Sequence, residues 1–169
     1  MKALRQATKS QHETLRHKHA MQESFTELLH NKNLKITPQR LAILELIYEN
    51  GHIGVEEIYQ HIKQFQPNIS LATVYKNVAT LSEMDILREV KPPTQKQKYE
   101  LASDKHIHVS CEQCGKLQDV HVDVGKLLRV CMSKTGYALF DVSAVFIGVC
   151  AECQQTQKHS IDKKSFGAL

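Results

Sequence analysis

Residues 69–81 read ISLATVYKNVATL, and this stretch is the most informative part of the chain for its fold. Ser70 can cap a helix, and apolar residues then recur at helical spacing, so we expect a helix through about Asp85 with one buried face. The apolar residues of that face are Leu71, Val74, Val78 and Leu81.

The opposite face of this expected helix suits the reading of DNA. A small residue and a hydroxyl allow close approach, Tyr75 offers a ring to thymine methyl groups, and Lys76 can bond guanine or phosphate. An ordinary amphipathic helix with a solvated polar face is the alternative. Basic residues before the helix and after it could add phosphate contacts. The candidate DNA-binding residues are Ala72, Thr73, Tyr75, Lys76, Asn77, Arg40, Lys35 and Lys96.

The elements expected on either side of this helix have the order of a winged helix-turn-helix. Apolar periodicity begins at Ser24, where Phe25, Leu28 and Leu29 share a helical face. A second helix starts at Thr37-Pro38 and stops at Asn50-Gly51, and a third joins Val55, Ile58, Ile62 and Phe65 on one face. After the fourth helix, residues 87–90 and 98–101 are expected to form a hairpin with Pro92-Pro93 near its tip.

The chain beyond His106 predicts a small α/β domain. Alternating segments at Ile107 to Val109 and 117–122 indicate strands, 124–134 indicates an amphipathic helix, and 142–149 indicates further strands. The overall class is therefore α/β (α+β), with a winged helix first and the smaller mixed domain second.

Two cysteine knuckles, CEQC at 111–114 and CAEC at 150–153, carry the clearest chemical signal. Four thiolates at such spacing can close a tetrahedron around Zn²⁺, and a site without an open coordination position is structural rather than catalytic. Buried or disulfide-bonded cysteines are the alternative. The expected zinc ligands are Cys111, Cys114, Cys150 and Cys153; Cys131 stands alone on the amphipathic helix and is expected to be a core residue.

Composition excludes some classes and leaves others open. Without an apolar run of membrane-spanning length or an apolar secretory core, the expectation is a cytoplasmic protein that does not enter membranes. Five cysteines then favour metal binding over a disulfide framework. The formal charge of +4 says little about nucleic acid, because four thiolates on one zinc ion would lower it by about two.

Four features together resemble the Fur family of metalloregulators: Thr37-Pro38-Gln39-Arg40, residues 69–77, the pair His106/His108 just before Cys111, and the two knuckles. The resemblance covers about residues 24–155. It implies a homodimer that binds a palindromic operator in double-stranded DNA. Together with the element pattern, it gives the expected order of domains along the chain: 1–23 extension, 24–101 DNA-binding winged helix, 102–105 hinge, 106–158 dimerisation and metal-sensing domain, 159–169 tail.

The same resemblance implies a second, regulatory metal site that joins the two domains. Its matching residues are His52, Glu100, His106, His108 and Asp119. Imidazoles and carboxylates favour Fe(II) or Mn(II) over soft copper(I), and two histidines at i, i+2 share one strand face. A loop histidine at position 52 and a solvated strand at 106–108 are the alternative.

This chain departs from the iron-sensing pattern in two respects. A further metal site of many iron sensors would need ligands where Lys105, Ile107 and about Val142 stand, so we expect that site to be absent. Glu100 resembles the iron-sensing subgroup, whereas Asp119 resembles the peroxide-responsive, PerR-like subgroup. The hypothesis is therefore a repressor of the oxidative stress response that senses peroxide through oxidation at bound Fe(II), with His52 or His106 gaining an oxygen; an Fe(II)-responsive ferric uptake regulator is the alternative.

Two other classes compete with a regulator. A zinc enzyme would need an open coordination position and a general base, and the sequence has no nucleophile motif, no Gly-rich phosphate loop and no His-Glu-x-x-His. We therefore expect no enzymatic activity. A zinc-stapled interaction module that never touches DNA is the other competitor.

Overall fold

The computed structural model describes residues 19–93, 95–103 and 105–156, and the chain divides into two compact units. The first unit comprises residues 1–89 and 98–102, and the second comprises 90–97 and 103–169. The loop 90–97, which we expected to belong with the winged helix, thus groups with the second unit. Most of the expected N-terminal extension and all of the expected C-terminal tail lie outside the described residues.

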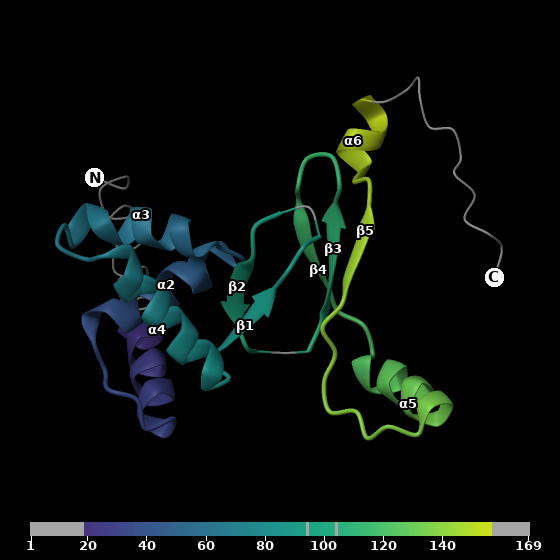
Figure 1. The fold of residues 1–169 in the computed structure, drawn as a ribbon, viewed down its shortest axis with the longest axis horizontal. Coiled ribbons are helices and arrows are strands. Elements are labelled where there is room, and N and C mark those ends of the chain that lie inside the picture. Colours follow the sequence, from purple (N-terminus) through teal and green to yellow (C-terminus); the bar gives the residue numbers. More distant parts are fainter. Residues whose placement is uncertain (1–18, 94, 104, 157–169) are drawn as a thin grey trace, which may run out of the picture. The chain divides into compact units, whose positions relative to one another are not determined.

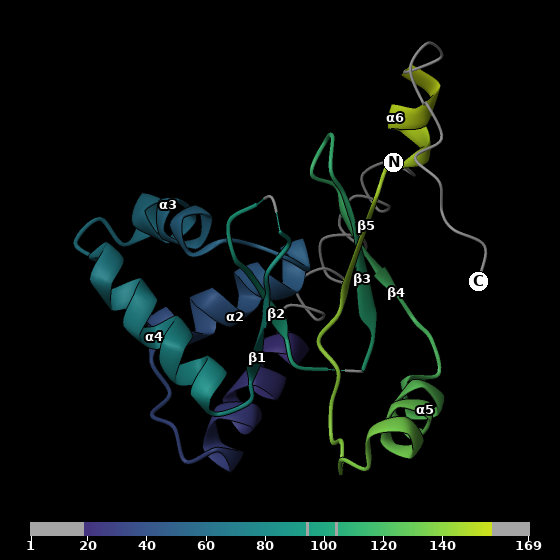
Figure 2. The ribbon, with the colours of Figure 1, turned by 45° about the vertical axis from the view of Figure 1, so that its right-hand side comes forward.

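The first unit has the element order expected of a winged helix (Figure 1). Residues 19–31 are helical. They are followed by α2 (Pro38–Asn50), α3 (Val55–Phe65) and α4 (Leu71–Glu83), and then by β1 (Leu87–Val90) and β2 (Lys98–Leu101), which are neighbours in a two-stranded sheet. Figure 2 shows α3 and α4 to the left of this pair of strands and α2 passing behind it.

Local sequence signals explain where these helices begin. The Thr37 hydroxyl accepts a hydrogen bond from the Arg40 amide at 3.3 Å, and Pro38 opens α2 with a fixed φ. The Ser70 hydroxyl accepts from the Thr73 amide at 3.1 Å and caps α4. Fifteen buried apolar residues from all of these elements then form one core.

Two residues that we expected in this core are exposed instead. Leu71 stands at the first position of α4, and Phe65 at the last position of α3. Each lies at a helix end that extends past the core, although the spacing places both on the apolar face. Val74, Val78 and Leu81 of the same expected set are buried as predicted.

The second unit contains a three-stranded sheet of order β4-β3-β5, in which β3 is central (Figure 1). β3 (Ile107–Cys111) pairs antiparallel with β4 (Leu117–Val120) and parallel with β5 (Val145–Gly148). The parallel pair requires a crossover, which contains α5 (Val124–Thr135). Gly136 caps the end of α5, and its φ of 75° favours glycine.

Some sequence expectations for this unit need correction. Residues 121–122 and 142–144 are not strand, because only β3 offers partners and pairing ends where β3 ends. The helix α6 (Ala151–Thr156) was not expected, since it is short and coincides with the second cysteine knuckle. Cys131 on α5 is half-buried rather than a core residue.

The second unit has few buried apolar residues in a single chain. Among its described residues they are Val90, Ile107, Cys111 and Val124. By contrast, large apolar side chains are exposed along β5, α5 and the segment between them; the set is Leu127, Val130, Met132, Tyr137, Phe140, Phe146 and Ile147. None of the helices in the described ranges is long and apolar enough to cross a membrane.

Candidate metal centres and DNA-binding surface

The two cysteine knuckles meet at one end of the sheet. Cys111 ends β3 and stands opposite Gly148 of β5, so the parallel register brings Cys150, two residues farther on, beside it. The four sulfur atoms all lie within 4.8 Å of one another, and Cys114 Sγ is 3.7 Å from Cys150 Sγ. Sulfurs about 2.3 Å from a tetrahedral zinc ion are about 3.8 Å apart, so the four-cysteine cluster is compatible with a zinc site.

Backbone amides make the four thiols unequal. Hydrogen bonds from the backbone of Cys114 and then of Cys150 lower the pKa of Cys111 to about 6, and the Cys150 amide lies 3.3 Å from Cys111 Sγ. The neighbouring sulfurs, led by that of Cys150, raise the pKa of Cys153 to about 12. A cation at the centre would favour deprotonation of all four groups, because thiolates are the metal-binding form.

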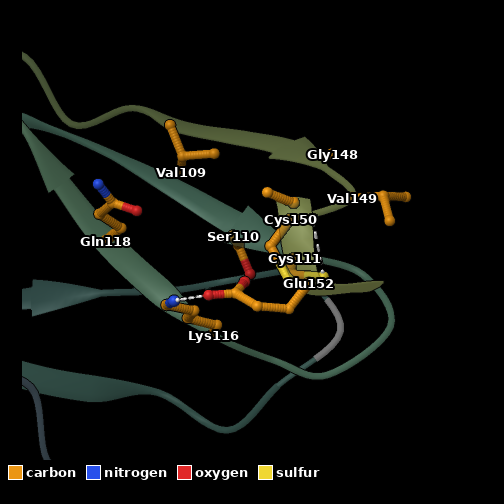
Figure 3. Close-up of a pocket in the computed structure, with 10 residues that line it drawn as sticks. Val109, Ser110, Cys111, Lys116, Gln118, Gly148, Val149, Cys150 and Glu152 are labelled. Carbon is orange, nitrogen blue, oxygen red and sulfur yellow. Dashed lines mark hydrogen bonds and ion pairs between the residues drawn. The ribbon is translucent and has the colours of Figure 1, made fainter. Parts of the chain in front are cut away.

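An ion pair that the sequence analysis missed connects the two knuckles. Lys116 Nζ lies 2.8 Å from Glu152 Oε1, although the residues are 36 positions apart (Figure 3). The hydrogen bond from Lys116 is the main cause that lowers the pKa of Glu152 to about 2, and Glu152 in turn raises the pKa of Lys116. Both side chains line a cavity of about 240 Å³ together with Cys111 and Cys150. Lys116 stands two residues after Cys114, and Glu152 stands between Cys150 and Cys153, so their opposite charges close to the two knuckles were a signal that could have revealed the pair.

The first unit brings together two of the five expected regulatory ligands. His52 follows the end of α2, and Glu100 is a buried residue of β2. His52 Nε2 lies 2.9 Å from Glu100 Oε2. Two ligand atoms at right angles, each about 2.1 Å from a metal ion, are about 3.0 Å apart, so this separation fits a shared ion.

The second unit brings together the other three expected ligands. His106 and His108 are buried, and their Nε2 atoms lie 3.1 Å apart. Asp119 is the cross-strand partner of His108 in β4, and its Oδ1 lies 3.6 Å from Nε2 of each histidine. The nitrogen and oxygen donors converge, and this donor set suits Fe(II) or Mn(II). The solvated strand considered as an alternative is therefore wrong for the two histidines.

The expected recognition residues lie on the exposed side of α4. Tyr75 is 44% exposed, and its hydroxyl donates to Glu56 Oε1 at 3.1 Å, while Lys76 is exposed. Local hydrogen bonds occupy neighbouring polar groups of the same helix and its cap: Asn77 Nδ2 donates to the Thr73 carbonyl, and the Ser70 and Thr73 hydroxyls lie 2.8 Å apart. Ala72 is also exposed.

The other expected DNA contacts lie outside α4. Arg40 is half-buried, and its Nη1 donates to the Lys35 carbonyl at 2.6 Å, which fixes the segment before α2. Lys96 is exposed in the loop between β1 and β2. Beside it, Gln95 Nε2 donates to the buried Ser110 hydroxyl of β3 at 3.1 Å, a contact within the second unit that the sequence did not indicate.

Comparisons with known proteins identify the family. The ferric uptake regulator family matches residues 31–146. The chain belongs to this family. The peroxide-responsive repressor PerR of Staphylococcus saprophyticus is 33% identical over 138 residues, which are 80% of this chain and 93% of that protein.

Solved structures agree with this assignment. The Campylobacter jejuni peroxide stress regulator is 30% identical, with a TM-score of 0.62 over 78% of this chain and 97% of its own. The Vibrio cholerae ferric uptake regulator is 29% identical, also with a TM-score of 0.62, over 73% and 98%.

Family membership confirms the coarse functional expectation. Fur-family proteins are dimeric DNA-binding regulators rather than enzymes, so this chain is a metal-responsive transcriptional regulator. The enzyme and the DNA-independent interaction module considered from the sequence are not supported.

One residue near the regulatory ligands escaped the sequence analysis. Arg88 of β1 lies with its Nη1 3.3 Å from Glu100 Oε1, and its side chain is 19% exposed. Arg88 and Glu100 are equally distant in sequence from position 94, the middle of the expected hairpin, so symmetry about the turn could have indicated the pair.

Proposed function

We propose that this Fur-family regulator is a peroxide-responsive repressor. The observation that carries the proposal is the short carboxylate of Asp119 held against the buried pair His106 and His108. The identity to PerR proteins of staphylococci supports it. Glu100, a longer carboxylate, favours the second candidate, an Fe(II)-responsive uptake regulator.

In this proposal the five ligands bind one regulatory ion, Fe(II) or Mn(II). His52 and Glu100 come from the first unit, and His106, His108 and Asp119 come from the second. Within each unit the donor atoms are spaced as ligands of one ion would be. The resemblance to the family is the reason for assigning both sets of ligands to the same ion. An ion that binds both groups favours the arrangement of the two units in which they converge, by its differential affinity for that arrangement. We propose residues 102–105 as the hinge between domains at 24–101 and 106–158.

When bound, Fe(II) would supply the electrons that reduce hydrogen peroxide, and His52 or His106 would be the ligand imidazole that gains one of its oxygen atoms while the other leaves as water. The protein's part is to hold these rings at the ion. An oxidised imidazole is a poor ligand, so the connection between the units is lost and the repressor leaves its operator.

We propose that Cys111, Cys114, Cys150 and Cys153 hold a structural zinc ion and that the second unit forms the homodimer. The apolar side chains exposed on α5 and β5 in one chain are of the kind that a partner copy covers. A zinc ion that joins the two knuckles would stabilise the sheet from which this surface projects.

DNA contact is proposed for the exposed face of α4 and for flanking basic residues, on a palindromic operator that matches the twofold symmetry of the dimer. The residues are Ala72, Thr73, Tyr75, Lys76, Asn77, Arg40, Lys35 and Lys96. A repressor of chromosomal genes acts in the cytoplasm, which is where we place it.

Peptide mass spectrometry combined with a gel shift on the protein's own promoter region tests the proposal. The iron-loaded dimer should lose DNA binding on stoichiometric peroxide while His52 or His106 gains one oxygen. The manganese-loaded dimer should bind DNA and resist peroxide. Unmodified histidines in a fully iron-loaded dimer would refute the peroxide function and support the iron-responsive one.

A further inference from the structure

The buried carboxylate Glu100 is shared between two partners in the first unit. Its Oε2 lies 2.9 Å from His52 Nε2, and its Oε1 lies 3.3 Å from Arg88 Nη1. The Glu100 side chain is 5% exposed and the Arg88 side chain 19% exposed, so water competes little for these contacts. The two oxygens of the Glu100 carboxylate therefore contact different residues.

Glu100 Oε2 is paired with another expected ligand, His52, and Oε1 accepts from Arg88. Oε2 and His52 Nε2 stand at the separation of two adjacent ligands of one ion, so an ion can replace the proton that they share. Oε1 is turned to a guanidinium, which stays charged at all physiological pH values and cannot give up its proton to make room for a metal. A carboxylate that offers both oxygens to an ion would have to share Oε1 between that ion and Arg88, and the positive guanidinium disfavours a second cation at the same oxygen.

We propose that Arg88 is a positioning residue of the regulatory site that limits Glu100 to one oxygen ligand. This inference rests on the proposed regulatory ion, although not on the chemistry of peroxide. With Arg88 in place, three imidazoles, Asp119 through one oxygen and Glu100 through Oε2 supply five donors.

The consequence concerns the length of the carboxylate. Glutamate has one more methylene than aspartate and could swing to present both oxygens. Arg88 removes that freedom and makes the longer side chain act as a single-oxygen ligand, which preserves a coordination position for a small molecule. The apparent conflict between Glu100 and Asp119 over which stimulus the protein senses is thereby reduced.

The test is Co(II) binding to the full-length, zinc-loaded dimer, followed by visible absorption spectroscopy. Five-coordinate Co(II) absorbs more strongly in the visible than six-coordinate Co(II). We expect a five-coordinate spectrum for the unmodified protein and a weaker, six-coordinate spectrum for Arg88→Gln. Arg88→Lys keeps a charged donor near Oε1 and should restore the five-coordinate spectrum. Arg129→Gln, which removes an exposed arginine paired with Asp123 at 3.9 Å on α5, is the matched control and should change nothing.

Mn(II) affinity gives a second readout that a merely structural role would not shift in this direction. Arg88→Gln frees Oε1 and removes a positive charge near the ion, so we expect it to bind Mn(II) about tenfold more tightly. An unchanged cobalt spectrum in Arg88→Gln would overturn the proposal, and so would weaker Mn(II) binding, which would mean that Arg88 only orients Glu100. If the unmodified dimer bound no Co(II) or Mn(II) besides its zinc, the proposed regulatory site itself would be refuted.

Discussion

Replacement of Cys150 by Ser should unfold the second unit while the first unit stays folded. Cys150 contributes one of four sulfurs, and its amide donates to Cys111 Sγ, so the substitution removes one thiolate and disturbs the position of a second. A three-thiolate site exposes the ion to water and exchange, and we expect the variant to be isolated without stoichiometric zinc.

The expected magnitude follows from how little apolar surface the second unit buries. Among the residues of this unit that the structure describes, the buried aliphatic side chains are Val90, Ile107 and Val124, and together they contribute on the order of 5 to 9 kcal/mol of burial free energy. A structural zinc site in a small peptide contributes about 10 to 16 kcal/mol. The zinc contribution is thus at least as large as that of the apolar core in one chain, whereas the first unit has fifteen buried apolar residues of its own.

Hydrogen exchange with mass spectrometry measures this difference along the full chain. Amides of β3, β4 and β5 should lose protection in Cys150→Ser, those of α2 to α4 should keep it, and native mass spectrometry should show monomer without zinc. Cys131→Ser is the matched control, since Cys131 lies outside the cluster on α5, and it should keep both zinc and dimer. A zinc-free Cys150→Ser dimer with protected strands would refute the reasoning.

Three further predictions concern single side chains. A carboxyl NMR titration should find the pKa of Glu152 at about 2, and Lys116→Gln should move this pKa toward the ordinary value of 4.5. Because the folded-state pKa is lowered, the ion pair is complete above about pH 4.5 and is lost as the pH falls toward 2. The effect on stability should be small, because both side chains are exposed. Lys76→Ala should cost about 1 to 3 kcal/mol in specific operator binding measured by gel shift, whereas Lys96→Ala should weaken binding to all sequences alike and reduce the salt dependence. Asp119→Glu should keep repression with manganese and slow peroxide release of the iron form, and an equal release rate would count against the short carboxylate as the determinant.

The secondary structure of the first unit could be predicted from the sequence because its signals are local. Thr37-Pro38 and Ser70 mark helix starts, and the periodicity of Ile43, Leu44 and Ile47 marks a buried face. Periodicity gives the direction of a side chain and not how far the core extends along the helix. Leu71 and Phe65 lie on the correct faces but at helix ends, and for that reason they are exposed.

The second unit was harder to predict because its strands and surfaces depend on distant partners. The strand at 117–122 reads as apolar alternation, yet it ends at Val120, since pairing is set by the length of β3. The amphipathic pattern of α5 is real, but most of its apolar side chains are exposed in one chain. A hydrophobic pattern indicates that a helix face is buried in the assembled protein, but it does not indicate whether the same chain or a partner chain covers that face.

The ligand residues could be predicted because the spacing that brings them together is visible in the sequence. The side chains that contact and orient these ligands could not be predicted in the same way. Cys111 and Cys114 are separated by one tight turn, and the i, i+2 spacing of His106 and His108 brings two imidazoles to one side of the chain. Arg88 has no such spacing to a ligand residue, and the equal distance of positions 88 and 100 from the expected turn is a weaker signal, because the contact to Glu100 is made across two strands. Glutamate and aspartate differ by one methylene. We propose that the effect of this methylene on how many carboxylate oxygens reach the ion depends on whether a neighbour such as Arg88 restrains the side chain. If the proposal for Arg88 holds, the residues that contact the second oxygen of each carboxylate act together with Asp119 in setting the stimulus that this protein senses.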